Sequence, residues 1–248
     1  MHHFFVSPEQ IFENEKYIRI TGQDVNHIRQ VLRMNTGEEI GIRTGEDAKE
    51  YRCMICRMEP DAVDARIMWV REQDTELPSE ICLFQCLPKS DKMEWIIQKA
   101  VELGVKRIIP VSSRRSIVKL DGSKEEKRIR RWNAVSESAA KQSCRSYVPQ
   151  VMSVMTFPEA VSYAKDLDIL LIPYELAKDM EQTRTVLSRI RSGMSVGIFI
   201  GPEGGFDPQE VLLAQEAGAY EITLGRRILR TETAGIALIA ALMLQLEP

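Results

Sequence analysis

Several marks of common enzyme classes are missing from this chain of 248 residues. It has only three histidines, which do not cluster, and no G-x-S-x-G motif, so little in it indicates nucleophilic catalysis. It lacks both the glycine fingerprint of dinucleotide-binding proteins and the P-loop of nucleotide-binding proteins. The most common cofactor and hydrolase motifs are therefore excluded.

A long apolar run is missing as well. The longest apolar stretch, residues 234–246, is too short to span a bilayer and is typical of a buried helix. No basic segment followed by an apolar one stands near the start, so nothing indicates secretion. We expect a cytoplasmic protein without a membrane partner.

Cysteine is sparse, and the five cysteines are an odd number, which favours free thiols. Cys53 and Cys56 form a C-x-x-C pair in a strand-like run, where residues three apart point to opposite faces. No second pair and no nearby histidine completes a zinc set. We expect structural cysteines and no metal site.

Positive charge is not in excess, since 33 Lys and Arg face 36 Asp and Glu. The overall balance does not predict a nucleic-acid partner, but residues 124–131 carry five bases against two acids. A local basic face is typical of phosphate binding, although a solvated helix face explains 124–131 equally well. Further basic residues follow at Lys141, Arg145, Arg226, Arg227 and Arg230.

The first 72 residues or so show short, partly alternating apolar runs separated by turn residues, which indicates strands. One predicted helix interrupts them: Asp24 can cap it, and Val25, Ile28, Val31 and Leu32 follow at helical spacing. Many short strands with one helix predict a small β-barrel. The polar segment 72–78 ends in proline, and we place the domain boundary there, between residues 72 and 73.

From residue 81 onward, strands and helices alternate, which predicts a parallel α/β sheet. Asp91 with Glu94, and Asp207 with Glu210, have the spacing of capping boxes. Thr231 is placed to cap the last helix. The expected strands are 81–87, 105–111, 169–173, 196–200 and 220–224, and the longer expected helices are 124–143, 178–192 and 233–246.

Two glycine-containing segments stand out near the end, residues 201–206 (GPEGGF) and 224–234 (LGRRILRTETA). Each follows an apolar run typical of a buried strand, and each runs into a helix. Ligands of open α/β sheets bind at the carboxyl ends of such strands, and a bare glycine backbone can approach a ligand closely. The alternative is a tight turn that binds no ligand. This alternative could explain one of the two segments, but it explains the presence of both less well.

These two segments together resemble the RsmE family of SPOUT methyltransferases. Residues 27–33 (HIRQVLR), 89–110 and 114–120 are similar to further signatures of that family. One departure is that His3 precedes Phe4 and Phe5, where the family usually has a basic residue.

The resemblance implies an N-terminal PUA-like β-barrel, residues 1–72, that binds RNA. It also implies a C-terminal SPOUT α/β domain, residues 73–248, with a deep trefoil knot through which the last helix is threaded. The implied activity is methylation of N3 of a uridine in 16S ribosomal RNA of the small subunit, with S-adenosylmethionine as cofactor. Two other readings remain open: a SPOUT enzyme acting on transfer RNA or on a ribose 2′-oxygen, and a ribosome assembly factor with a vestigial pocket.

The loops after residues 172, 200 and 224 are the implied cofactor site. Methyl transfer depends mainly on positioning, and uridine N3 must also lose its proton. We expect Arg230 to act as a cation near the methyl group or a phosphate, unless it only pairs with Glu203 or Glu232. Glu232, in competition with Glu203, is the candidate carboxylate beside the base. The expected cofactor contacts are Leu171, Ile172, Pro173, Tyr174, Glu175, Ile200, Gly201, Pro202, Glu203, Gly204, Gly205, Leu224, Gly225, Ile228, Leu229, Arg230, Thr231, Thr233 and Ala234.

Candidate RNA contacts lie in both predicted domains. Three of them belong to the predicted N-terminal helix, where exposed charges without a partner are the alternative. The full set is His3, His27, Arg29, Arg33, Lys89, Arg114, Arg115 and Arg145.

The final helix is apolar nearly all round, so it should be buried on every side. We expect one of its faces to pack against a second copy, giving a C2 homodimer, as the resemblance also implies. Enclosure of this helix by its own chain is the alternative.

Overall fold

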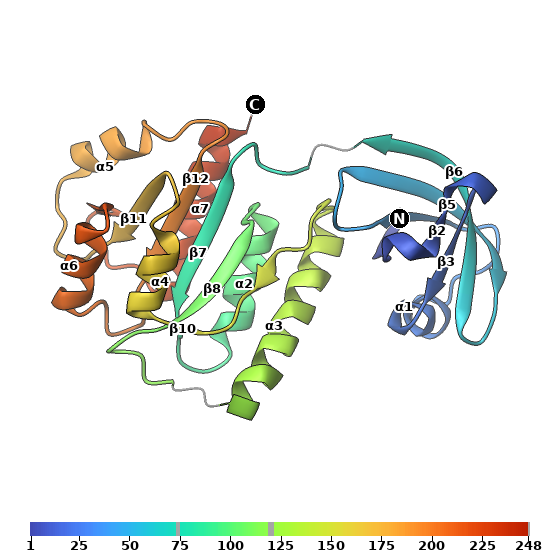
Figure 1. The fold of residues 1–248 in the computed structure, drawn as a ribbon, viewed down its shortest axis with the longest axis horizontal. Helices are drawn as coiled ribbons and strands as arrows, with labels where there is room; N and C mark the ends of the chain where they lie inside the picture. Colours follow the sequence, from blue (N-terminus) through green and yellow to red (C-terminus); the bar gives the residue numbers. More distant parts are fainter. Residues whose placement is uncertain (73–74, 119–121, 248) are drawn as a thin grey trace. The chain divides into compact units, whose positions relative to one another are not determined.

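The structure, a computed structural model, describes residues 1–72, 75–118 and 122–247. It divides into two compact units, one comprising residues 1–76 and 140–148 and the other residues 77–139 and 149–248 (Figure 1). The predicted boundary falls beside residues 73 and 74, which lie outside the described ranges. The sequence did not predict that residues 140–148 return to the first unit. Within the described ranges, no helix is long and apolar enough to cross a membrane.

The first unit is built on a six-stranded sheet with the order β1-β4-β5-β6-β3-β2. Neighbouring strands are antiparallel, except that β1 runs parallel to β4. Buried side chains from five of these strands meet in one core, so the sheet curls around its inner face. The strands are His2–Phe5 (β1), Ile11–Phe12 (β2), Tyr17–Thr21 (β3), Glu39–Arg43 (β4), Lys49–Met58 (β5) and Ala62–Glu72 (β6), and short 3-10 turns cover Pro8–Gln10 and Glu13–Glu15.

The helix predicted in this unit is short and changes its winding. It begins as α1, Gln23–Asn26, and continues as one π-helical turn over His27–Val31. Val31 is exposed rather than buried, because the wider π turn rotates the later residues away from the core. The predicted cap at Asp24 is wrong: Gly22 occupies the N-cap, and the Asp24 carboxylate accepts a hydrogen bond from Lys141 Nζ at 3.0 Å.

The second unit confirms the predicted parallel α/β sheet. Its strand order is β10-β8-β7-β12-β11-β13, with β9 beside β8, and every pair is parallel. The strands are Glu80–Cys86 (β7), Arg107–Ser112 (β8), Gln150–Val151 (β9), Met155–Thr156 (β10), Ile169–Pro173 (β11), Ser195–Ile200 (β12) and Ala219–Ile222 (β13). The helices are Lys92–Glu102 (α2), Gly122–Gln142 (α3), Phe157–Ala164 (α4), Met180–Leu187 (α5), Pro208–Glu216 (α6) and Thr231–Leu246 (α7).

Helices cover both faces of this sheet. Alternate residues of a strand point to opposite faces, and Phe84 of β7 joins the core under α4 and α6, whereas Leu83 lies against Gly235 of α7. The strand β13 is at the sheet edge, but α7 packs on the central strands β7 and β12. The connecting loop 223–230 must therefore cross the carboxyl ends of the strands. Threading of α7 through a knot stays a prediction.

Of the three helix starts predicted for this unit, the structure confirms one in full and differs from the other two. The capping box of Asp207 and Glu210 opens α6 as predicted. Asp91 occupies the N-cap of α2 without a side-chain capping bond, and Glu94 accepts a hydrogen bond from Arg131 instead. The prediction for Thr231 is wrong by one residue, because Arg230 occupies the N-cap of α7.

Candidate functional site

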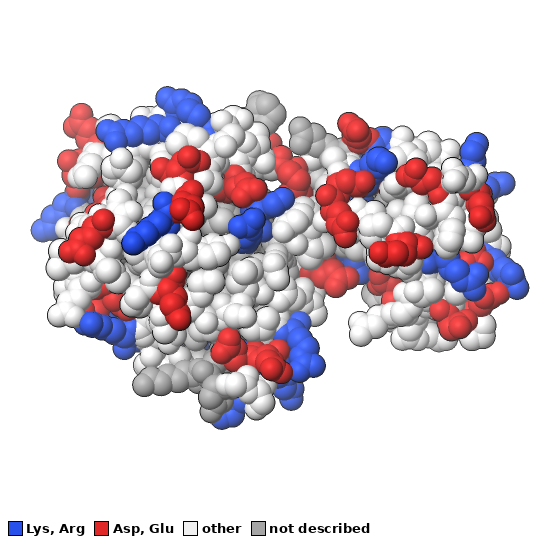
Figure 2. Space-filling model, viewed as in Figure 1, with Lys and Arg blue, Asp and Glu red and all other residues white. Residues whose placement is uncertain are grey.

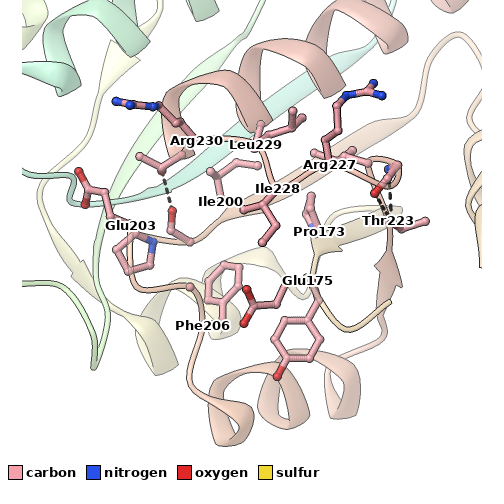
Figure 3. Close-up of a pocket in the computed structure, with 18 of the residues that line it drawn as sticks. Pro173, Glu175, Ile200, Glu203, Phe206, Thr223, Arg227, Ile228, Leu229 and Arg230 are labelled. Carbon is pink, nitrogen blue, oxygen red and sulfur yellow. Dashed lines mark hydrogen bonds between the residues drawn. The ribbon is translucent and has the colours of Figure 1, made fainter. Parts of the chain in front are cut away.

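A cavity of about 380 Å³ opens at the carboxyl ends of β11, β12 and β13 (Figure 3). Pockets for small molecules have volumes in this range. Three loops and the first residues of α7 form the wall. The lining residues are Lys92, Pro173, Tyr174, Glu175, Ile200, Gly201, Pro202, Glu203, Gly205, Phe206, Thr223, Leu224, Gly225, Arg226, Arg227, Ile228, Leu229, Arg230, Thr231 and Ala234.

Bare backbone forms part of this wall at two glycines. A Cβ at Gly201 would lie 3.2 Å from the ring of Phe206, which is itself buried against Phe157 and has little room to move. Gly225 has φ +106°, in the left-handed region that other residues rarely adopt. Both loops therefore require glycine where they face the cavity.

The side chain of Thr231 joins three parts of the second unit. Its hydroxyl donates to the backbone oxygen of Gly201 at 2.6 Å and accepts from Gln85 Nε2 at 2.9 Å. The start of α7 is thereby fixed to loop 201–206 and to β7. These bonds explain why Thr231 does not cap its own helix. Gln85, which is fully buried, has a supporting role that the sequence analysis missed.

Lys92, the first residue of α2, lies between two carboxylates at one end of the cavity. Its Nζ is 3.0 Å from Glu203 Oε1 and 3.3 Å from Glu232 Oε2. The hydrogen bond to Glu203 raises the pKa of Lys92. Lys92 was absent from the residues predicted for the site. A lysine in the first turn of a helix, where the dipole disfavours a cation, was the available signal.

The two carboxylates differ in how firmly they are held. Burial by itself would raise the pKa of Glu203, but hydrogen bonds from its own backbone amide, from Lys92 and from the amide of Lys89 outweigh this and lower it. Glu203 is therefore ionised at neutral pH and fixed in place. Glu232 Oε2 is buried and accepts no hydrogen bond from the described part of the chain. Its partner is Lys92 Nζ at 3.3 Å, a longer separation than the 3.0 Å between Lys92 and Glu203.

Arg230 lies at the rim of the cavity and is exposed. Among the described residues it forms no ion pair, so the alternative of a bridge to Glu203 or Glu232 is not observed. In Figure 3 the side chains of Arg227 and Arg230 point away from the centre of the cavity, whereas the Glu175 carboxylate points toward it. The arginines are thus placed for a ligand outside the cavity and Glu175 for one inside.

Most of the predicted cofactor residues line the cavity, but some do not. Leu171 and Ile172 are fully buried in β11, and Thr233 is exposed on α7. A Cβ at Gly204 would face Arg115 rather than the cavity. Cavity residues absent from the predicted set are Lys92, Phe206, Thr223, Arg226 and Arg227.

The predicted RNA contacts of the second unit are exposed beside loop 201–206. Lys89 and Arg114 lie on the surface, and Arg115 donates to the backbone oxygen of Gly204 at 3.0 Å. Lys119 and Leu120 of the signature 114–120 lie outside the described residues.

In the first unit the predicted RNA contacts fall into two groups. His27 and Arg33 are exposed, and Arg29 is half-buried and donates to the backbone oxygen of Pro60. Arg145 is 2% exposed and bonded to Glu76, so its guanidinium is not available to RNA, contrary to the prediction. His3 is also largely enclosed: its Nε2 is 3.2 Å from Glu50 Oε1, and its Nδ1 is 3.8 Å from Cys144 Sγ.

The cysteines are free thiols, as predicted. Cys53 is buried and Cys56 exposed, in agreement with their opposite directions along β5. Burial raises the pKa of Cys53 to about 12 and that of Cys82 to about 11. No group of three or more potential metal ligands comes together in the described ranges.

Comparisons with known proteins agree with this architecture. An RNA methyltransferase domain family matches residues 75–243, and an RNA methyltransferase PUA domain family matches residues 20–68. Ribosomal RNA small subunit methyltransferase E of Bacillus subtilis is 36% identical over 251 residues, which cover 100% of this chain and 98% of that protein. The protein of the same name from Mesomycoplasma hyopneumoniae is 32% identical over 96% of this chain and 97% of its own length.

A solved structure extends the similarity to the fold. The crystal structure of ribosomal RNA small subunit methyltransferase E from Neisseria gonorrhoeae, bound to S-adenosylmethionine, has a TM-score of 0.84 and 32% sequence identity. The alignment covers 99% of this chain and 98% of that one. The chain therefore belongs to the ribosomal RNA small subunit methyltransferase E family.

Proposed function

We propose that this protein transfers the methyl group of S-adenosylmethionine to N3 of a uridine in 16S ribosomal RNA of the small subunit. The observation that carries the proposal is the cavity at the ends of β11, β12 and β13, walled by the two glycine loops. Full-length relatives are named as small-subunit ribosomal RNA methyltransferases, and one such structure contains the cofactor. We propose the cytoplasm as its location, because ribosomal RNA is the proposed substrate.

The cavity fits S-adenosylmethionine in size and chemistry. Ile200 and Leu229 give it apolar surface, while the backbone at Gly201 and Gly225 can approach a ligand closely. The Glu175 carboxylate is directed inward, where it can accept from hydroxyl or ammonium groups (Figure 3). When bound, the cofactor supplies an electrophilic methyl group. The protein's task is to hold it and the target base in line.

Removal of the N3 proton falls to one of the two carboxylates beside Lys92. Glu203 already accepts hydrogen bonds from the Lys89 amide and the Lys92 ammonium, so we assign it the role of holding loop 201–206 against the start of α2. Glu232 Oε2 pairs with Lys92 Nζ at 3.3 Å, and no backbone amide of the described residues bonds to it; we assign Glu232 as the proton acceptor, with Lys92 keeping it in place. General bases of this kind contribute about 10²- to 10⁴-fold in rate.

RNA reaches the cavity across a basic rim. Arg226, Arg227 and Arg230 are exposed in loop 223–230, and Arg114 and Arg115 lie beside loop 201–206. The drawn face of the molecule mixes basic and acidic side chains, so binding depends on such local groups rather than on the net charge (Figure 2). We assign Arg230 to a phosphate next to the target uridine or to the charge on the base.

The first unit is the proposed RNA-binding domain, in line with the PUA match over residues 20–68. We keep 1–72 and 73–248 as the proposed functional division. His27, Arg29 and Arg33, in and just after the helical stretch, are the proposed contacts of this domain. Arg145 is withdrawn because it is buried.

A homodimer through α7 completes the proposal. Leu244 of α7 is 75% exposed, and Thr233, Ala237 and Ala241 lie exposed along the same side of the helix. A mostly apolar stripe left open on an apolar helix fits a second copy related by twofold symmetry.

Nucleoside mass spectrometry tests the proposed reaction. Small subunits from a deletion strain, incubated with the purified protein and S-adenosylmethionine, should gain 3-methyluridine in 16S RNA. Methylation of transfer RNA or of a ribose 2′-oxygen would refute the assignment of substrate. A melting temperature that S-adenosylmethionine does not raise would instead indicate an assembly factor, because a ligand of the folded state stabilises it.

A further inference from the structure

The β5–β6 ribbon of the first unit displays an exposed tryptophan for which the proposed reaction has no use. Trp69 of β6 is 44% exposed, and its neighbours Met68 and Val70 are exposed to a similar degree. Large apolar side chains are more often buried. Because successive residues of a strand point to opposite faces, the surface around Trp69 is formed by its cross-strand neighbours rather than by Val70, which pairs with Tyr51.

Two arginines flank the tryptophan ring. Arg52 of β5 is the cross-strand partner of Trp69, and Arg71 follows two residues later on the same side of β6. Their guanidinium carbons are 5.9 Å and 5.3 Å from the centre of the ring, within the range of cation–π contacts. Arg52, Trp69 and Arg71 form an array of three planar groups, which we name the Trp69 array.

Both arginines of the array are already paired with carboxylates. Arg52 donates to Glu39 Oε2 from Nε at 2.8 Å and from Nη2 at 2.6 Å. Arg71 donates to Glu50 Oε2 from Nε at 3.0 Å and from Nη2 at 2.8 Å. These bonds hold each guanidinium along its edge, although Glu50 is shared with Arg43, whose Nη2 lies 3.5 Å from the same oxygen. The donor edges of the array are thus already engaged and its flat faces remain, which suits a nucleic-acid base better than a phosphate.

Part of the same sheet face is already covered by the chain itself. Glu50, opposite Arg71, is fully buried beneath His3, and Cys144 from the returning segment 140–148 lies against His3. Met1 Sδ accepts from Arg52 Nη1, so among the described residues Trp69 and Arg71 are the more exposed members of the array.

We infer that the Trp69 array stacks unpaired bases of the RNA substrate. The inference rests on the proposed function for the identity of the polymer. Proteins hold single-stranded RNA by stacking its bases on aromatic rings and on guanidinium planes, and such stacking tolerates any base because every base has a π face. The array adds a side-chain contact on the sheet to the contacts proposed for residues 27–33.

Binding of a labelled oligouridylate to the full chain tests this inference. Trp69→Ala should weaken binding about 10-fold, the effect of losing one stacked base, and Trp69→Phe should retain most of the affinity. An RNA duplex of equal length should bind both variants as it binds the wild type. Trp95→Ala is the matched control, since Trp95 is 46% exposed on α2 of the second unit, and it should bind oligouridylate normally.

Salt dependence separates stacking from charge. Loss of a phosphate contact lowers the slope of log affinity against log salt by about 0.7 for single strands, whereas Trp69→Ala should leave the slope unchanged. Unaltered oligouridylate affinity in Trp69→Ala would overturn the inference, as would an equal loss for single strand and duplex. A change in sedimentation with unchanged RNA affinity would show that the array contacts a second copy instead. Intact oligouridylate binding without any methylation would refute the proposed function and leave the array standing.

Discussion

The cavity of the second unit and the Trp69 array of the first unit are two proposed binding sites that are built in opposite ways. The cavity is made of loop backbone, with glycine where its wall must be thin and exposed arginines at its rim. The array is made of side chains on two paired strands, and both of its arginines are bonded to carboxylates. Backbone shape suits a small ligand of fixed outline, whereas flat side chains suit a polymer that must slide and be released.

The largest expected effect comes from filling the thin wall of the cavity. In Gly201→Val a Cβ would lie 3.2 Å from the buried Phe206 ring, so the loop must shift into the cavity. We expect the affinity for S-adenosylmethionine to fall about 100-fold, the upper end of overpacking costs. Isothermal titration calorimetry measures it.

Gly204→Ala is the control for that variant. Its Cβ would lie 3.5 Å from the Arg115 side chain, an ordinary contact outside the cavity. Cofactor affinity should be unchanged. A normal affinity of Gly201→Val for S-adenosylmethionine would show that the bare backbone at Gly201 does not determine cofactor binding.

A second variant tests the charges at the end of the cavity. Lys92→Met removes the cation between Glu203 and Glu232 and keeps the length of the side chain. We expect kcat to fall about 10²-fold, because the cation that keeps the Glu232 carboxylate in place is lost. Lys99→Met, which breaks only the pair with Glu102 on the same helix, should leave kcat unchanged. A normal kcat in Lys92→Met would contradict the assignment of Glu232 as the proton acceptor.

A third pair of variants tests whether the second unit binds a second copy of the chain through the exposed side of α7. The wild type should sediment at twice the chain mass of 28.3 kDa. Leu244→Glu should sediment at the single chain mass, because a carboxylate would be buried in the interface. Leu212→Glu changes an equally apolar residue, 57% exposed on α6, and should remain dimeric. A wild type that is monomeric at micromolar concentration and active would end the dimer proposal.

The smallest effect concerns pH. The folded-state pKa of Glu203 lies below its ordinary value of 4.5, so its bonds stabilise the fold above about pH 4.5, and this stabilisation is lost as the pH falls through the folded pKa. The melting temperature of the wild type should exceed that of Glu203→Gln by about 2–4 °C at neutral pH. The difference should vanish in acid. A constant difference would show that Glu203 acts by shape rather than by charge.

Local sequence patterns predicted the loops that line the cavity, but they did not predict the side-chain bonds that hold these loops in place. The segments 201–206 and 224–234 follow apolar runs that any sequence reading identifies as strands, so their place at the strand ends follows directly. The bond of Gln85 to Thr231 joins residues 146 positions apart, and that of Lys92 to Glu203 joins residues 111 apart. No periodicity reports such pairings, so Thr231 was predicted as a cap.

In the first unit, too, contacts between residues distant in the sequence could not be predicted from local patterns. Arg145 carries a charge, so a surface position was the natural prediction, but its neighbours come from the other end of the unit, at Glu76. The Trp69 array depends on the β5–β6 register, which shifts between Arg52 and Cys53. An irregular pairing of this kind cannot be read from either strand alone.

Because residues 140–148 return to the first unit, the two units are completed in a particular order while the chain is being synthesised. Domains generally fold as units while the chain emerges from the ribosome, the N-terminal one first. Here the contacts of Cys144 with His3 and of Arg145 with Glu76 can form only after residues 77–139 have been made. Until then its sheet stays uncovered, while the chain between residues 77 and 139 has already been made and has no complete sheet to join. A nascent chain stalled before residue 140 should thus be sensitive to protease in both units, and one stalled after the first unit has fully emerged should be protected in the first unit alone.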